Sequence, residues 1–149
     1  MANSKRKLLL NALRDTILPA ITTGGGYNNS VQTIERGLKE IDSIPDSSFP
    51  AIYISRSTEE RTNITINQFQ SRLKVILVAY VKRADGSAQE VMDDFIEDIS
   101  KALEQDRKQG GLVKWTEVKS IDTDDGDLDP HAACAIVVEF NYVSEGVTP

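Results

Sequence analysis

The chain has 149 residues, 40% of them apolar, and it carries 17 Lys and Arg against 23 Asp and Glu. This length fits one domain, residues 1–149, with enough apolar side chains for a core. A net charge of −6 argues against a protein that grips nucleic acid or an anionic membrane, because both need clustered cations. The single cysteine, Cys134, excludes an internal disulfide and fits a reducing, cytoplasmic setting.

The N-terminal region predicts a helix followed by an irregular loop. Leu and Ile recur at helical spacing, so we expect an amphipathic helix over about residues 4–18, ended by Pro19. ITTGGGYNNS follows, and its three Gly and two Asn favour an irregular loop over residues 22–30. A phosphate-binding loop is disfavoured, because no strand precedes the glycines and no Lys-Ser or Lys-Thr follows them. The sequence predicts neither a signal peptide nor a membrane span.

Two short strands and a long polar segment come next. VQTIER, residues 31–36, and AIYIS, residues 51–55, predict short strands joined by a Pro- and Ser-containing connection. Residues 55–70 contain few apolar anchors, and we interpret them as a loop or as a hairpin arm that projects from the body. Both charge signs in such an arm can set the register of a contact. The candidate interaction residues are Arg56, Glu59, Glu60 and Arg61.

The C-terminal half carries the clearest periodicity. Residues 71–83, SRLKVILVAYVKR, alternate at period two with apolar residues on both faces, which predicts a strand whose middle is covered on both sides. Residues 88–107 predict a helix with one apolar stripe that packs on that strand. Residues 113–123 alternate imperfectly, as edge strands often do, and residues 134–143 predict the last strand. The helical stripe includes Val91, Phe95, Ile99 and Leu103.

The order of these elements predicts the fold class. Two consecutive strands close the chain, and consecutive strands favour antiparallel pairing. Each amphipathic helix needs a sheet on which to bury its apolar stripe. We therefore expect an α+β fold in which a mostly antiparallel β-sheet carries two main helices on one face.

The acidic stretch DTDDGDLD, Asp122–Asp129, is a candidate cation site. An EF-hand loop with Gly at position six needs acidic oxygens at positions one, three and five and Glu at twelve. With Gly126 at six, those positions hold Ile121, Thr123, Asp125 and Ala132, so one position in four fits. We interpret the stretch as a hairpin turn in which Asp125-Gly126 adopts positive φ angles. The alternative is a weak cation site formed by Asp122, Asp124, Asp125 and Asp127.

A catalytic centre is not indicated by any motif. His131, the only histidine, lies beside the acidic stretch, and Asp127 or Asp129 can orient it as a base, but no nucleophile accompanies it. Cys134 falls on the apolar face of the last strand, where a cysteine usually packs in the core. We expect no enzyme, no cofactor and no metal. The alternative is a small metal-dependent enzyme that uses His131 and the Asp122–Asp129 cluster.

The order and texture of the segments also point to a known family. The N-terminal helix runs into ILPAITTGGGYNNSV, and PAIYIS, a polar segment and LKVILVAYVKR follow. The helix EVMDDFIEDISKAL, the acidic turn and AIVVEFNYV complete the pattern, which covers about residues 5–143. This layout resembles the tail terminator (tail completion, minor tail protein U-like) family of tailed bacteriophages.

The resemblance implies a structural virion protein without catalytic residues. It implies a homo-oligomeric ring, a hexamer, that caps the head-proximal end of the tail tube, ends tail growth and provides the head-tail joining surface. The implied partners are further copies of the chain, the tail tube protein and a head-tail connector or neck protein. DNA passes through such a ring without specific binding, and no membrane is involved. The implied location is the virion tail or neck, with assembly in the host cytoplasm; the alternative is another phage neck or connector protein.

Overall fold

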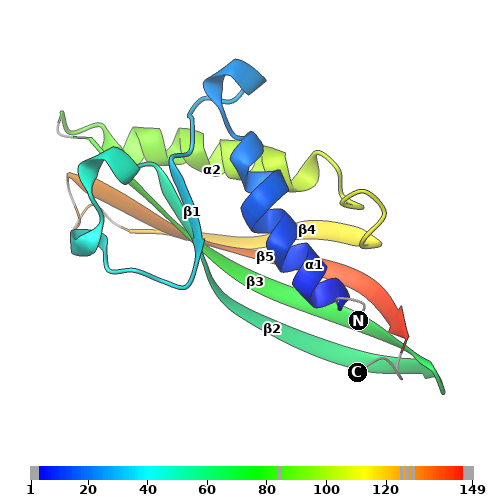
Figure 1. Cartoon of the computed structure of the whole chain (residues 1–149). Coiled ribbons are helices and arrows are strands. Elements are labelled where there is room, and N and C mark those ends of the chain that lie inside the picture. Colours follow the sequence, from blue (N-terminus) through cyan, green and yellow to red (C-terminus); the bar gives the residue numbers. More distant parts are fainter. Residues whose placement is uncertain (1–3, 84, 125, 127, 129, 146–149) are drawn as a thin grey trace.

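One five-stranded sheet, in the order β1-β2-β3-β5-β4, forms the body of the molecule (Figure 1). The computed structural model describes residues 4–83, 85–124, 126, 128 and 130–145. The strands are β1 (Thr33–Arg36), β2 (Ala51–Thr65), β3 (Gln68–Lys82), β4 (Trp115–Thr123) and β5 (His131–Glu145). β1 and β2 run parallel, and the other neighbouring pairs are antiparallel. The sheet is therefore mostly antiparallel, and the predicted edge position of residues 113–123 is confirmed.

Two helices lie on one face of this sheet (Figure 1), which confirms the α+β prediction. α1 (Lys5–Ala12) begins at Ser4, whose hydroxyl accepts a hydrogen bond from the Lys7 amide. The helical path continues as a π-helical segment (Leu13–Ile17) and a 3-10 turn (Leu18–Ala20). The helical path therefore does not end at Pro19, as the sequence predicted, but includes it. The proline is tolerated there because it lies in the first turn of a helical segment, where it loses no hydrogen bond. α2 spans Ala88–Glu104.

The main core lies between the helices and the sheet. Phe95, Ile99 and Leu103 of α2 are fully buried in it, as their spacing predicts, and Val91 is only partly buried. β3 and β5 contribute alternate side chains to the same core. These are Leu73, Val75, Leu77, Ala79 and Val81 of β3, and Ala132, Cys134, Ile136, Val138, Phe140 and Tyr142 of β5.

The opposite face of the sheet is covered only at one end. The segment between β1 and β2 contains two short 3-10 helices, Ile41–Ser43 and Asp46–Ser48. It packs Ile44 and Phe49 against Tyr53 and Tyr80. The predicted double cover of the central strand is thus right near Tyr80. Towards the other end of β3, Arg72 and Lys74 are exposed. We call the whole side of the sheet opposite the helices the open face.

The polar segment over residues 55–70 is a hairpin rather than a loop. β2 continues to Thr65, pairs with β3 along its length, and turns through residues 66–67. The hairpin extends past the end of the helices (Figure 1). The polar sequence gave no clear strand pattern. The second half of β2 contributes no apolar side chain to the core, so apolar and polar residues need not alternate there. The last strand likewise begins at His131, three residues before the predicted start.

Candidate interaction surfaces

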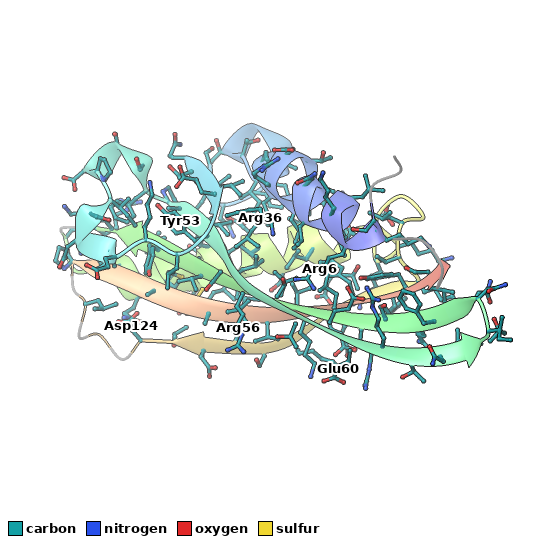
Figure 2. All side chains as sticks on the ribbon, turned by 60° about the horizontal axis from the view of Figure 1, so that its bottom comes forward. Arg6, Arg36, Tyr53, Arg56, Glu60 and Asp124 are labelled. Atoms are coloured by element: carbon teal, nitrogen blue, oxygen red, sulfur yellow. The ribbon has the colours of Figure 1, made fainter. Side chains whose placement is uncertain are left out.

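The four candidate interaction residues lie on β2 but on both sides of the sheet. A register shift lies between Ile54 and Arg56. Beyond it, Glu59 is paired with the core residue Leu73, whereas Glu60 is paired with the exposed Arg72. Side chains alternate between faces, so Glu59 and Arg61 lie on the helix side, and Arg56 and Glu60 lie on the open face. Figure 2 shows Arg56 and Glu60 on one side of the sheet and Arg6, with α1, on the other.

Glu59 is the centre of a hydrogen-bonded network on the helix side. Its side chain is 6% exposed, and its carboxylate accepts hydrogen bonds from Tyr142 Oη at 2.8 Å, Ser71 Oγ at 3.1 Å and Arg61 Nε. Arg6 Nη1 of α1 lies 3.8 Å from the same carboxylate. Burial by itself would raise the pKa of Glu59, but the three hydrogen bonds hold it below its usual value. Glu59 therefore links α1, β2, β3 and β5, and offers little surface to a partner.

The other three candidates are accessible. Arg61 is 60% exposed, and its guanidinium carbon lies 4.3 Å from the centre of the Phe69 ring. On the open face, Glu60 forms an ion pair with Arg72 at 3.1 Å, and both side chains are more than half exposed. Arg56 is exposed on the same face. An interaction role remains a prediction for all four residues, and the open face presents Arg56 and Glu60.

The turn of the β2-β3 hairpin exposes isoleucine. Ile66, in the two-residue turn, is 95% exposed, and Ile64 just before it is 52% exposed. Turn positions usually hold Gly, Asn, Asp, Pro or Ser, because these residues favour the backbone conformations of turns. Isoleucine has no such preference, so turn geometry does not explain Ile66. These residues were not among the predicted interaction residues, although two isoleucines in the polar run TNITINQ are a usable signal.

A shallow hollow of about 530 Å³ lies on the open face at the end away from the hairpin turn. Its floor is apolar and comes from β3 and β5, and its rim is acidic. The floor includes Val78, Tyr80, Ala133 and Ala135. The rim includes Glu40 and Asp42 of the β1-β2 segment and Asp122 and Asp124 from β4 and the residue after it. Sequence patterns do not predict this hollow, because it joins segments that are distant along the chain.

The acidic stretch borders the hollow with three of its residues, Asp122, Asp124 and Leu128. Asp124 accepts hydrogen bonds from the amides of Ala133 and Gly126 and from Gln89 Nε2, at 2.8, 2.9 and 3.0 Å. Burial would raise the pKa of Asp124, but these donors hold it below its usual value. Gly126 has a φ of 98°, as the turn interpretation requires. Asp124 therefore connects Gly126 to β5 and to Gln89 of α2; Figure 2 labels Asp124 at this end of the sheet.

The predicted cation ligands are only partly described. Asp125, Asp127 and Asp129 lie outside the described residues. Among the residues that are described, no three His, Cys, Asp or Glu side chains gather as a metal site would need.

His131 and Cys134 are both in packed surroundings. The His131 ring lies 5.3 Å from the Phe49 ring. Cys134 is buried in the main core, as its position in the sequence pattern predicts, and burial raises the pKa of its thiol to about 12. The thiolate is the nucleophilic form of cysteine, so this thiol is protonated and unreactive at neutral pH.

The glycine-rich loop over residues 22–30 is held by a buried carboxylate. Asp98 of α2 is 2% exposed and accepts hydrogen bonds from the amides of Asn28 and Asn29, at 2.8 and 2.9 Å. Asp98 lies outside the apolar stripe of the helix, and only the packed structure shows that its carboxylate meets the loop. Asp98 thus anchors the loop to α2.

Comparison with known proteins agrees with the resemblance found in the sequence. A family model described as bacteriophage tail tube terminator protein matches residues 3–148. No curated protein matches the chain. The matched region includes the hairpin, the hollow and both helices, and within the described part of the chain no helix is long and apolar enough to cross a membrane.

Proposed function

The chain belongs to the bacteriophage tail tube terminator family, and we propose that it forms a hexameric ring on the head-proximal end of a tail tube. In that position the ring ends growth of the tube and provides the surface to which the head is joined. The observation that carries this proposal is the family match over residues 3–148. Membership of the family makes the chain a structural component of a phage tail.

The proposed partners follow from that position. They are further copies of the chain, the tail tube protein, and a head-tail connector or neck protein, and the protein resides in the virion tail or neck after assembly in the host cytoplasm. We propose that residues 1–149 act as one domain, since the described strands belong to one sheet. DNA passes the ring without specific binding, because a chain of net charge −6 repels phosphate.

A structural role rather than an enzymatic one is supported by the surroundings of the reactive side chains. The Cys134 thiol is buried with a raised pKa, and the His131 ring packs against Phe49. Asp124 uses its carboxylate to hold a turn. Each of these groups has a structural task in the fold, and we assign none of them to catalysis.

Electron microscopy of tail tubes tests the proposed function. Purified protein is mixed with tubes assembled from tail tube protein, and the tube ends are imaged before and after further tube protein is added. We expect ring-shaped density at one end of each tube and no further growth from that end. Tubes that keep growing without density at their ends would contradict the proposal. Binding to isolated head connectors, but not to tubes, would favour a neck or connector protein instead.

A further inference from the structure

The hairpin turn and the hollow both expose apolar surface. We use the name hairpin tip for residues 62–70. The tip presents Ile66, which is 95% exposed, and Ile64, which is 52% exposed. The hollow presents an apolar floor that includes Val78 and Ala135. An exposed apolar side chain at a turn and an open apolar depression are both features that a protein-protein contact removes from water.

The two surfaces are also complementary in charge. Residues 55–75 carry four basic residues against two acidic ones, within a chain whose net charge is −6. The hollow has four acidic residues at its rim. The tip itself carries no charged residue. The net positive charge lies on the two strands behind it, where Arg61 and Arg72 also pair with Glu59 and Glu60, and negative charge surrounds the depression. Opposite potentials of this kind favour encounter and fix the register of a contact.

The tip and the hollow cannot meet within one chain. Both lie along β3, where Gln68 follows the turn and Val78 lies in the floor of the hollow. At about 3.3 Å per residue these two positions are roughly 33 Å apart. Figure 2 shows the hairpin and Asp124 at opposite ends of the sheet. A contact between the tip and a hollow therefore requires a second copy of the chain.

We propose that the hairpin tip of one copy inserts Ile66 into the hollow of the next copy. The net positive charge of the strands behind the tip then lies towards the acidic rim of that hollow. Each copy contributes its hairpin tip to one contact and its hollow to another. Such head-to-tail contacts form a ring when the rotation between successive copies closes. This inference rests on the proposed function and names the contact that closes the proposed ring.

Disulfide trapping on tail tubes tests the geometry directly. Ile66→Cys and Ala135→Cys are combined in a chain that also carries Cys134→Ala, so that the native thiol does not compete. After capping under reducing conditions and then oxidation, we expect a non-reducing gel to show linked species up to the size of the ring. Chains with only one introduced cysteine are the controls and should show no ladder.

The outcomes separate the inference from the proposed function. If the parent protein caps tubes and the double-cysteine protein caps them without forming linked species, the inference is wrong and the proposed ring stands. If the parent protein leaves tube ends bare, the proposed function itself fails and the contact fails with it.

A substitution pair provides a second measurement that does not depend on cysteine chemistry. Ile66→Asp removes the apolar tip, and we expect the concentration needed to cap half of the tube ends to rise at least about tenfold, as for the loss of a central interface residue. The matched control is Leu8→Asp, which changes a side chain of α1 that is 41% exposed and should leave capping unchanged. Both variants should keep the parent melting temperature. Capping by Ile66→Asp at the parent concentration would overturn the inference.

Discussion

The two faces of the sheet are built by the same strands but are stabilised differently. On the helix side, alternate residues of β3 and β5 enter the main core, and even the carboxylate of Glu59 is enclosed by hydrogen bonds. On the open face, Glu60, the next residue along the chain, is 57% exposed and pairs with Arg72. Two neighbouring glutamates therefore have different roles, because alternation along a strand sends one into the fold and the other into solvent.

This difference predicts which substitutions unfold the protein and which affect only assembly. Changes on the helix side should reduce the free energy of unfolding. Changes of exposed side chains on the open face should alter that free energy little and affect contacts between molecules instead.

The largest effect on stability is expected for Phe95→Ala. The Phe95 side chain is fully buried between α2 and the sheet, and truncation of such a residue costs roughly 3–5 kcal/mol. Urea unfolding followed by circular dichroism measures the change. A loss below about 1 kcal/mol would show that α2 does not pack as described. Leu8→Ala, on the exposed side of α1, is the control and should have little effect.

Glu59→Ala should have the next largest effect. It leaves the hydroxyls of Tyr142 and Ser71 and the guanidinium of Arg61 without their shared acceptor. Loss of an acceptor from a buried charged network costs about 3 kcal/mol. Glu60→Ala is the matched control, one residue away on the open face, and should cost under about 0.5 kcal/mol. Equal losses for the two variants would contradict the division between the two faces.

Acidification should reveal the same network. The pKa of Glu59 is lower in the folded protein than the usual 4.5. The network therefore contributes stability above about pH 4.5, and this contribution is lost as the pH falls through the folded pKa. In Glu59→Gln we expect a lower free energy of unfolding at neutral pH and a shallower decline below pH 4.5. Parallel pH profiles for the parent and Glu59→Gln would show that the carboxylate does not act in this way.

The smallest effect on stability is expected for charge reversal on the open face. Arg56→Glu combined with Glu60→Lys changes two exposed side chains and should alter the free energy of unfolding by under about 0.5 kcal/mol per site. If these residues set the register of a contact with a neighbouring copy or with the tail tube, the fraction of capped tubes should fall. Unchanged capping would place the interface elsewhere on the surface.

Part of the molecule follows from local sequence pattern alone. Period two in SRLKVILVAYVKR identified β3, and the apolar stripe around Phe95 identified α2 and its buried side. The position of the turn at Gly126 also followed from its neighbours, because an Asp-Gly pair accommodates positive φ angles. The family resemblance rested on the same elements in the same order, and the family match supports it.

The candidate surfaces required tertiary structure. Glu59 is hydrogen-bonded to Tyr142, which is 83 positions away, and the hollow combines the β1-β2 segment, β3, β5 and the acidic turn. The sequence by itself determined the types and the order of the periodic elements, because periodicity is a property of neighbouring residues; it left residues 55–70 open between a loop and a hairpin arm. Only the tertiary structure decided which glutamate is buried and where the open face is hollowed. Those features depend on strand register, and a shift of one residue would exchange the two faces.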